Sequence, residues 1–580
     1  MKKQLIFLLG CCLSLPFLSA QNITIDVGQQ FQTMVGFAAS DCWTGNFVGK
    51  YWNADKKEQI AKWLFSQTIP TTGYAQGIGL SMWRVNLGAG TYEQGSASGI
   101  TDETRRAECF LDSEGNYDWT KQAGQQYFMQ KAKEYGCEHF VAFSNSPPVL
   151  WTRNNKGYSG SSTSANLQDD KYDEFAGYLT DVVKHFSDDG YNFSYISPVN
   201  EPQYEWTGTG QEGSPWTNTQ IKKIVTELNT AIVDKNLNTK ILVTEAGSYD
   251  YIYSSPTSHP NTAAGNQINF FNSTHSYYIG NLPSVAPVIG AHGYWTYGTT
   301  AGTINVRTQL KNYTSYRGVE VFQTEWSLLD AAPTDGFTSY EASTAYGDIA
   351  VFTARMIYFD LVYAGVSSWS WWTAMDMERY GQKNRFMLIA LEPGGNFYNP
   401  PTMTGNIYAR PNLWALGNYS LFVRPGYKRI QLTTGVEDLD GLIGTAYIAP
   451  DSSKIIAVYV NQCDSICNVS ADFVGLAGKK IVKQNMYYSN GSTALRQFGN
   501  ADSQIYESGK TSRFPARSVI TMVYALEDTE TAIRDLPPTT PYDSQAPVYD
   551  LLGRKVGTAQ TLSKLKAGVY IVGKQKMVVQ

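Results

Sequence analysis

The sequence predicts an α/β protein: a (β/α)8 TIM barrel with a β-sandwich side domain and a small C-terminal β tail. Between residues 33 and 372, eight short apolar runs alternate with helix-like segments, which is the pattern of a parallel barrel. After about Trp414 the sequence changes to short alternating strands separated by turn residues, as in a sandwich. At 580 residues the chain is long enough for one large domain with accessory domains.

Residues 1–20 have the pattern of a secretory signal peptide. Lys2-Lys3 precede an apolar run, and Leu18-Ser19-Ala20 form the small-residue site at which a signal peptidase would cut. We therefore expect an exported protein, located in the periplasm, at the cell surface or outside the cell. Leu8-Leu9-Gly10-Cys11 resembles a lipoprotein cleavage box, so lipidation at Cys11 is the alternative. No other run approaches the roughly 20 apolar residues that span a membrane.

The barrel is expected at residues 33–414. The segments between its strands carry helical periodicity, most clearly at Lys171–Phe186 and Ile221–Val233. A doubly wound open sheet is the structural alternative, but no Gly-rich phosphate turn follows the first strand. The eight predicted strands are Met34–Ala38, Leu80–Leu87, His139–Asn145, Tyr195–Asn200, Lys240–Glu245, Val288–His292, Val319–Glu325 and Val366–Trp372.

The sandwich is expected at residues 415–527, joined by an N-terminal strand within residues 21–32 that lies outside the barrel pattern. Residues 528–546 are rich in Pro, Thr and Asp and are typical of a linker. Residues 547–580 form a small β unit that resembles the C-terminal tails of exported bacterial proteins, some of which are sorting modules. An extra hairpin without a transport role is the alternative. The predicted sandwich strands are Ile430–Thr433, Leu442–Ile448, Ile455–Val460, Ile481–Tyr488 and Ser518–Tyr524.

Composition narrows the possible partners. Aromatic residues reach 13% of the chain while charged residues are only 17%, which suits carbohydrate binding, although a Trp/Tyr-rich core would give the same figures. A net charge of −5 without a basic cluster in the mature chain argues against nucleic acid. With five His and no Cys/His cluster we expect no metal and no cofactor, and we expect a monomer.

The cysteines leave one question open. Two of the seven cysteines lie in the signal peptide, and of the remaining five only Cys463 and Cys467 are close in sequence. They could close a small disulfide loop in an oxidising compartment, or both could be free thiols.

Two predicted barrel strands end in a carboxylate. The run from Tyr195 ends in Asn200-Glu201-Pro202, and the run from Val319 ends in Glu325-Trp326. Barrel enzymes keep their chemistry at the C-terminal ends of the strands. Retaining cleavage of a glycosidic bond needs two carboxyl groups about 5–5.5 Å apart, one as acid/base and one as nucleophile.

Four segments together resemble glycoside hydrolase family 30, a family of the clan A retaining barrel glycosidases. The resemblance spans roughly residues 22–527 and implies an acid/base on strand four, a nucleophile on strand seven and a side β-domain built from both chain ends. The segments are Gly36–Asp41, Phe143–Pro148, Ser197–Gln203 and Gln323–Trp326.

The resemblance also implies roles for individual residues. Glu201 matches the acid/base and Glu325 the nucleophile, while Asn200 matches the amide that precedes the acid. Arg84 matches the strand-two arginine that supports the ionised nucleophile. A nearby cation lowers a carboxyl pKa and burial raises it, so we expect Glu325 to be charged and Glu201 to keep its proton.

Other polar residues at the strand ends are weaker candidates. His292 and Tyr294 end strand six, where the clan commonly places a ring that hydrogen-bonds the nucleophile or substrate, and either could do so. Glu205 and Glu212 lie on the loop after Glu201 and lack a paired context. Glu245 ends strand five and could be a supporting group.

Tryptophans near the strand ends are candidate sugar platforms. One of Trp369, Trp371 and Trp372 is expected to serve, and we select Trp371. Trp151 and Trp206 follow strands three and four and are candidate subsite walls, with core packing as the alternative. Together with Trp295 after strand six, they would ring the barrel mouth, which favours an open cleft and endo-action.

The expected function is that of a secreted, retaining, endo-acting β-glycoside hydrolase whose substrate is a polysaccharide or oligosaccharide. Within family 30, Asn145–Pro148, Asn166–Tyr172 and Pro198–Gln203 most resemble endo-β-1,6-galactanases, which act on arabinogalactan-type polysaccharide by double displacement. A β-1,6-glucanase or a xylanase of the same family is the near alternative, because one barrel hosts many activities. A non-catalytic carbohydrate-binding protein is the alternative from a different class, and the presence of both carboxylates disfavours it.

Overall fold

The computed structural model describes residues 20–329, 346–380, 386–396, 398–435, 438–498, 504–529, 543–573 and 575–579. The chain forms two compact units, one reaching to Leu476 and including Ile481–Leu526, the other made of Ala477–Lys480 and Glu527–Gln580. Most of the predicted signal peptide and most of the predicted linker lie outside the described residues. Among the described residues, no helix has the length and apolar content that a membrane crossing requires.

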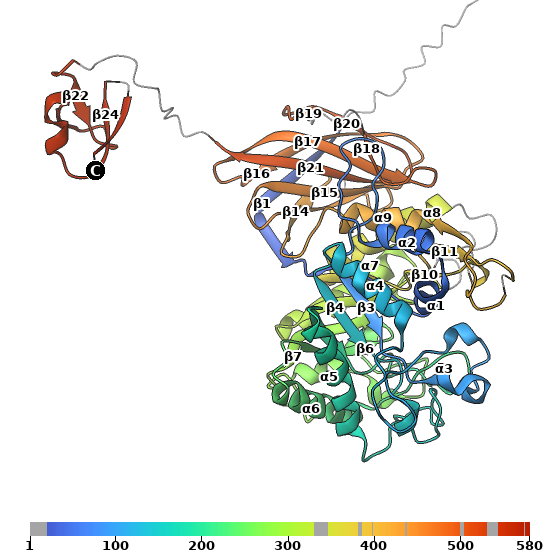
Figure 1. Cartoon of the computed structure of the whole chain (residues 1–580). Coiled ribbons are helices and arrows are strands. Elements are labelled where there is room, and N and C mark those ends of the chain that lie inside the picture. Colours follow the sequence, from blue (N-terminus) through green and yellow to red (C-terminus); the bar gives the residue numbers. More distant parts are fainter. Residues whose placement is uncertain are drawn as a thin grey trace, which may run out of the picture. The chain divides into compact units, whose positions relative to one another are not determined.

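Eight parallel strands close a barrel in the first unit (Figure 1). Each contains residues of the run predicted for it, because buried parallel strands give continuous apolar runs. The predicted barrel class is therefore confirmed. In order around the barrel the strands are β2 (Gly36–Ser40), β3 (Met82–Asn86), β4 (His139–Phe143), β5 (Phe193–Ser197), β6 (Lys240–Ala246), β7 (Val285–His292), β8 (Glu320–Trp326) and β9 (Ser368–Trp371), which pairs with β2.

Helices in the connections cover the barrel with their apolar faces. In α5 the predicted face is buried along the whole helix, from Tyr172 to Phe186. A capping box starts α6: the Thr217 hydroxyl accepts from the Gln220 N–H, and the Gln220 side chain returns to the Thr217 backbone. The α-helices of the barrel are α1 (Thr44–Tyr51), α2 (Ala54–Phe65), α3 (Thr91–Gln94), α4 (Ala123–Glu134), α5 (Tyr172–Asp188), α6 (Asn218–Asp234), α7 (Thr300–Tyr316) and α8 (Tyr346–Phe359).

Two additions follow the last barrel strand. A small sheet of β10 (Met375–Met377), β11 (Ile389–Glu392) and β12 (Asn406–Ala409) was not predicted, because runs of three or four residues carry little periodicity. Helix α9 (Pro411–Ser420) then packs Leu413, Leu416 and Tyr419 into the barrel core. The expected domain limit at residue 414 lies inside this helix.

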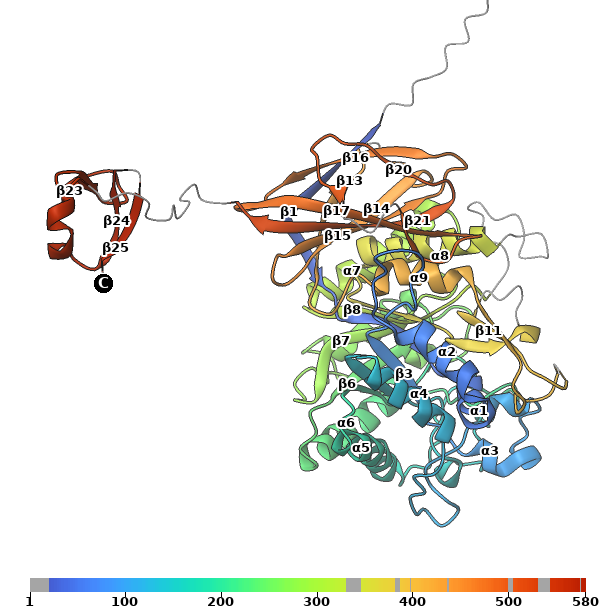
Figure 2. The same ribbon diagram turned by 45° about the horizontal axis from the view of Figure 1, so that its top comes forward.

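The side domain is one ten-stranded sheet that curls over its own core (Figure 2). Phe473 and Tyr524 belong to strands that are not hydrogen-bonded neighbours, yet their ring centroids lie 4.8 Å apart. The two halves of the sheet therefore face each other as a sandwich. Its path is β18-β17-β21-β15-β14-β13-β1-β16-β20, with β19 paired to β17. The bounds are β13 (Lys428–Thr433), β14 (Leu442–Ile448), β15 (Lys454–Asn461), β16 (Cys467–Val474), β17 (Lys479–Asn490), β18 (Arg496–Phe498), β19 (Gln504–Ile505), β20 (Ser512–Phe514) and β21 (Ser518–Asp528).

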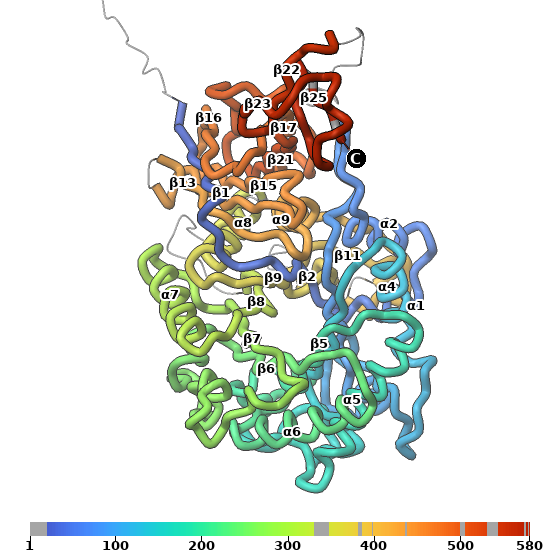
Figure 3. Tube along the Cα trace, turned by 90° about the vertical axis from the view of Figure 1, so that its left-hand side faces the viewer, coloured from blue at the N-terminus to red at the C-terminus, as the bar shows by residue number. Residues whose placement is uncertain are grey.

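The N-terminal strand β1 (Gln21–Thr33) lies within this sheet and not at its edge (Figure 3). It runs antiparallel to β13 and parallel to β16, and Ile23 aligns with Ala471. Ile23 and Ile25 are fully buried in the sandwich core. The strand therefore ties the start of the chain to the C-terminal domain.

The second unit carries a four-stranded sheet in the order β23-β22-β24-β25. Among its described residues, Val548 and Val572 are buried. The strands are β22 (Pro547–Tyr549), β23 (Lys555–Thr558), β24 (Gly568–Val572) and β25 (Gln575–Val579).

Candidate active site

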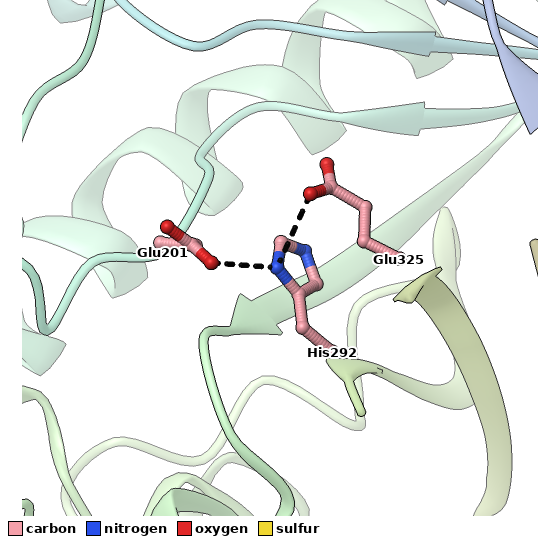
Figure 4. A group of neighbouring side chains, drawn as sticks. All are labelled: Glu201, His292 and Glu325. Atoms are coloured by element: carbon pink, nitrogen blue, oxygen red, sulfur yellow. Dashed lines mark hydrogen bonds and ion pairs between the residues drawn. The ribbon is translucent and has the colours of Figure 1, made fainter. Parts of the chain in front are cut away.

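Glu201 and Glu325 lie together at the carboxyl end of the barrel (Figure 4). Glu201 follows β5 and has a left-handed backbone, with φ of 39°, a conformation that is uncommon for non-glycine residues. Its N–H donates to the carbonyl oxygen of Glu245 at 2.9 Å. Glu325 is the next-to-last residue of β8. One carboxylate oxygen of each lies within 4.8 Å of the other.

His292, at the end of β7, lies between the two carboxylates and is fully buried. Its Nδ1 is 2.9 Å from Glu201 Oε1 and 3.4 Å from Glu325 Oε2. Its Nε2 is 3.2 Å from Glu245 Oε2. Burial alone would lower the pKa of His292, but the Glu325 charge and the hydrogen bonds to Glu201 and Glu245 raise it to about 10. The ring is therefore a cation at neutral pH.

Glu245, at the end of β6, holds this cation in place. It is fully buried, and its backbone is also left-handed, with φ of 53°. Ser197 Oγ donates to Oε1 at 2.7 Å, and Oε2 accepts from Thr324 Oγ1 as well as from His292. Burial would raise the pKa of Glu245, but the Arg84 charge and the His292 contact outweigh it and lower the pKa to about 2.

Arg84, from β3, supports the nucleophile candidate. Its Nη1 forms an ion pair with Glu325, and its Nη2 donates to Asn200 Oδ1 at 3.4 Å and lies 3.6 Å from Glu245. The guanidinium also lies over the ring of Phe143, 3.7 Å from its centroid. Two buried carboxylates therefore share one arginine.

The pKa of Glu325 differs from the expectation drawn from Arg84 alone. Burial raises the pKa of Glu325 above its ordinary value, although the charges of His292 and Arg84 both act to lower it. The sequence suggested the arginine but not the depth of burial, since Glu325 is only 4% exposed. The cations therefore limit the rise in pKa without reversing it.

Tyr294 completes the hydrogen bonding to Glu325. Its hydroxyl donates to Oε2 at 3.4 Å, and the side chain is buried. His292 and Tyr294, which the sequence left as alternatives, thus both contact Glu325.

A cleft of about 750 Å³ opens above the carboxylates. Trp206 lines it and donates its Nε1–H to the Glu201 carbonyl oxygen at 3.0 Å, which fixes the ring beside the acid. The cleft is lined by Asn145, Asn200, Glu201, Tyr204, Glu205, Trp206, Thr207, Gly208, Gly210, Gln211, Tyr294, Trp295, Glu325, Leu329 and Trp372.

Two tryptophans that were predicted to contact the substrate, Trp371 and Trp151, do not line the cleft. Trp371 is fully buried in the layer between barrel and helices, and its ring packs on Trp326. The residue that reaches the cleft is its neighbour Trp372, because consecutive strand residues point to opposite faces. Trp151 does not line the cleft: it packs edge-to-face against Tyr178 of α5, with ring centroids 6.3 Å apart.

Trp295, which the sequence placed at the barrel mouth, lines the cleft and is 49% exposed. Two other cleft residues, Asn145 and Tyr204, received no individual role from the sequence: Asn145 follows β4, and Tyr204 lies between the acid and Trp206. Each stands within three residues of a position already singled out. Their closeness in sequence to those positions is the signal that marks them.

Glu201, His292 and Glu325 form a group close enough to hold a metal ion in the described part of the chain. The contacts of His292 suit a protonated ring better than a metal ligand. Both ring nitrogens of His292 face carboxylate oxygens, so both carry hydrogens and neither offers a lone pair to a metal.

Comparisons with known proteins agree with this geometry. Residues 20–385 match the family described as O-glycosyl hydrolase family 30. An endo-β-1,6-galactanase of Hypocrea rufa is 26% identical over 384 residues, which are 62% of this chain and 68% of that protein. The structure of a conserved exported protein from Bacteroides fragilis is 32% identical, with a TM-score of 0.78 over 87% of this chain and all of that chain. The catalytic domain of a family 30 xylanase C from Talaromyces cellulolyticus, 20% identical, shares the fold with a TM-score of 0.59 over 87% of this chain and all of that domain.

Proposed function

Because the chain belongs to O-glycosyl hydrolase family 30 and is therefore a glycoside hydrolase, we propose that it is a retaining endo-β-1,6-galactanase. The observation that carries the mechanism is the approach of Glu201 and Glu325 to within 4.8 Å. Retaining enzymes hold their carboxyl groups about 5–5.5 Å apart, whereas inverting enzymes leave about 6.5–9.5 Å for a water molecule. The galactanase activity of the Hypocrea rufa relative supports the choice of linkage.

In the first step Glu201 is the acid and Glu325 the nucleophile. The bond between the anomeric carbon and the leaving oxygen breaks as the Glu201 proton passes to that oxygen. An oxygen of Glu325 forms a covalent bond to the anomeric carbon from the opposite face. In the second step Glu201 takes a proton from water, and the resulting hydroxide displaces Glu325.

The surrounding charges suit these two steps. Arg84 and the His292 cation both face the oxygens of Glu325, so they stabilise its charged form before attack and again when it leaves. Tyr294 donates to the same carboxylate. Asn200 lines the cleft directly beside the acid, where an amide can bind a sugar hydroxyl.

Endo-action is supported by where the aromatic side chains come from. Trp206 follows β5 and Trp372 follows β9, and these strands are four positions apart in an eight-stranded barrel, which places them on opposite sides of it. A cleft with aromatic rings from both sides suits several sugar units in a row. We therefore propose cleavage inside a polysaccharide chain.

We also propose that the mature enzyme is exported and acts on polysaccharide outside the cytoplasm. Support comes from the signal-peptide pattern of residues 1–20 and from the likeness to the exported Bacteroides fragilis protein.

A substrate panel tests the proposal. The purified protein is incubated with β-1,6-galactan, β-1,6-glucan and xylan, and reducing ends and product lengths are followed over time. We expect a ladder of galacto-oligosaccharides that shortens with time, and β-configured products by NMR. Faster cleavage of glucan or xylan would refute the linkage, and monosaccharide as the only early product would refute endo-action.

A further inference from the structure

Arg429, on β13, stands apart from the other buried arginines among the described residues. It is only 4% exposed. Its Nε–H donates to the Gln32 amide oxygen at 3.0 Å, and its guanidinium lies 3.9 Å from the ring centroid of Phe31. Its two Nη groups have no hydrogen-bond partner within the described part of the chain. Each of the other three buried arginines forms an ion pair with a carboxylate: Arg84 with Glu325, Arg307 with Asp360 and Arg355 with Asp440.

A second cation, Lys311 of α7, faces the same space. It is half-buried and forms no ion pair with any described residue. Burial lowers the pKa of Lys311, and the charge of Arg429 lowers it further. Burial also lowers the pKa of Arg429. Two like charges that are partly removed from water disfavour each other unless an anion lies between them.

These cations line a cavity of about 500 Å³ where the barrel meets the sandwich. Lys311 comes from α7 and Arg429 from β13, so both domains contribute (Figure 3 labels both elements). Asp438 is the carboxylate among the lining residues; it is exposed, accepts the Asp440 N–H at 3.0 Å, and pairs with neither cation. The cavity shares no lining residue with the catalytic cleft.

We propose that this cavity binds an oxyanion through Arg429 and Lys311. A guanidinium with two unpaired Nη groups matches the paired oxygens of a carboxylate, sulfate or phosphate, and a lysine adds a point charge. Thr433 of β13 and Thr445 of β14 also line the cavity. The cavity is large enough for one sugar unit, so the oxyanion is either a free inorganic ion or the carboxylate of a uronic acid.

Isothermal titration of the whole protein tests the proposal, with chloride added to keep the ionic strength constant. The ligands are sulfate, phosphate, glucuronate and, as a neutral control, galactose. We expect saturable binding of at least one anion and none of galactose at this site. Tighter binding of glucuronate would assign the site to an acidic sugar, and tighter binding of sulfate or phosphate to an inorganic ion.

Three variants locate the binding. Arg429→Gln and Lys311→Gln are each expected to weaken anion binding about tenfold or more, because each removes a charged donor. Lys483→Gln removes an exposed lysine of the sandwich strand β17 and is expected to change nothing. In anion-free buffer Lys311→Gln is expected to melt no lower than wild type, since it relieves repulsion. Undiminished binding in both site variants, or no anion binding in wild type, would overturn the proposal.

Discussion

At the scale of single residues, the two catalytic carboxylates are expected to fail in different ways. Glu325→Ala removes the nucleophile, so hydrolysis is expected to stop and azide to restore turnover by attacking the vacated face. The product would be a sugar azide of inverted configuration. Glu201→Ala is expected to lose about 10²–10⁴-fold on natural substrate and to keep activity on substrates with good leaving groups. Azide rescue of Glu201→Ala with an inverted product would exchange the two assignments.

Glu245 is expected to act as a positioning residue, because it contacts His292 and Arg84 and lines no part of the cleft. Glu245→Gln removes the charge that pairs with both cations. We expect kcat to fall about 10–100-fold, with KM little changed, because a hydrogen bond to a charged group is worth ~1.5–3 kcal/mol. We also expect the alkaline limb of the pH–rate profile to move to lower pH, since the pKa of His292 falls. An unchanged profile would show that Glu245 has only a packing role.

Glu212 is a matched control, because it too is fully buried but lies outside the cleft lining. Burial raises the pKa of Glu212 to about 7, although hydrogen bonds from Thr91 and Ala89 oppose the rise. For Glu212→Gln we expect near-wild-type activity, since the carboxylate holds the loop at residues 89–91 and contacts no catalytic group.

The two buried carboxylates have opposite expected effects on stability. The lowered pKa of Glu245, about 2 against 4.5, adds roughly 3 kcal/mol to the free energy of unfolding above pH 4.5, and this is lost as pH falls towards 2. The raised pKa of Glu212 has the reverse sign, costing stability as pH rises from 4.5 through 7. Denaturant unfolding of the wild type and of both Gln variants across pH 3–8 measures how the free energy of unfolding depends on pH. If this dependence were the same in all three proteins, neither carboxylate would have the expected effect.

The residues that could be predicted are those at strand ends with a distinctive neighbour. Glu201 follows an apolar run and is enclosed by Asn200 and Pro202, which marks it in the sequence alone. The strand end marks Glu245 as a candidate supporting group, but its partners could not be predicted, because His292 and Arg84 reach it from two other strands. The pKa of Glu325 depends on three-dimensional burial that no local pattern records.

At the scale of elements, β9 shows how adjacent residues in a strand differ in role. Trp371→Ala is expected to lower the free energy of unfolding by about 3–5 kcal/mol, because it empties a fully buried site. Trp372→Ala is expected to raise KM for long oligosaccharides, because this ring lines the cleft. Chemical denaturation and kinetics on a series of chain lengths separate the two effects. A kinetic defect without loss of stability in Trp371→Ala would reverse the assignment.

The sequence predicts that side chains alternate between the two faces of β9, but it does not predict which face points towards the cleft. A period of two places Trp369 and Trp371 on one face, and the face that contacts the helices follows only from the closed barrel. The eight barrel strands could be predicted because each is a continuous apolar run. The strands β10 to β12 and β18 to β20 could not, because they are too short to show a period.

At the scale of the whole molecule, the two compact units predict where the chain can be cut. Truncation after Thr529 preserves β21, which ends at Asp528, and is expected to leave a folded, active enzyme. Truncation after Ser420 removes the strands that cover Ile23 and Ile25 of β1 and is expected to give insoluble protein. Expression level, melting temperature and a galactanase assay compare the two truncated proteins. Loss of activity in the protein that ends at Thr529 would contradict the boundary between the two units.

The position of β1 has a consequence in time. Ser470 Oγ donates to Asn22 Oδ1 across 448 residues of chain, so the first strand made must wait for one of the last. At about 5–20 residues per second, synthesis of that interval takes roughly 20–90 seconds. Until β13 is made, β1 keeps both edges unpaired, and until β16 is made it keeps one, which is the state in which strands aggregate. The sandwich is therefore completed late in synthesis, and its first strand is exposed to aggregation until then.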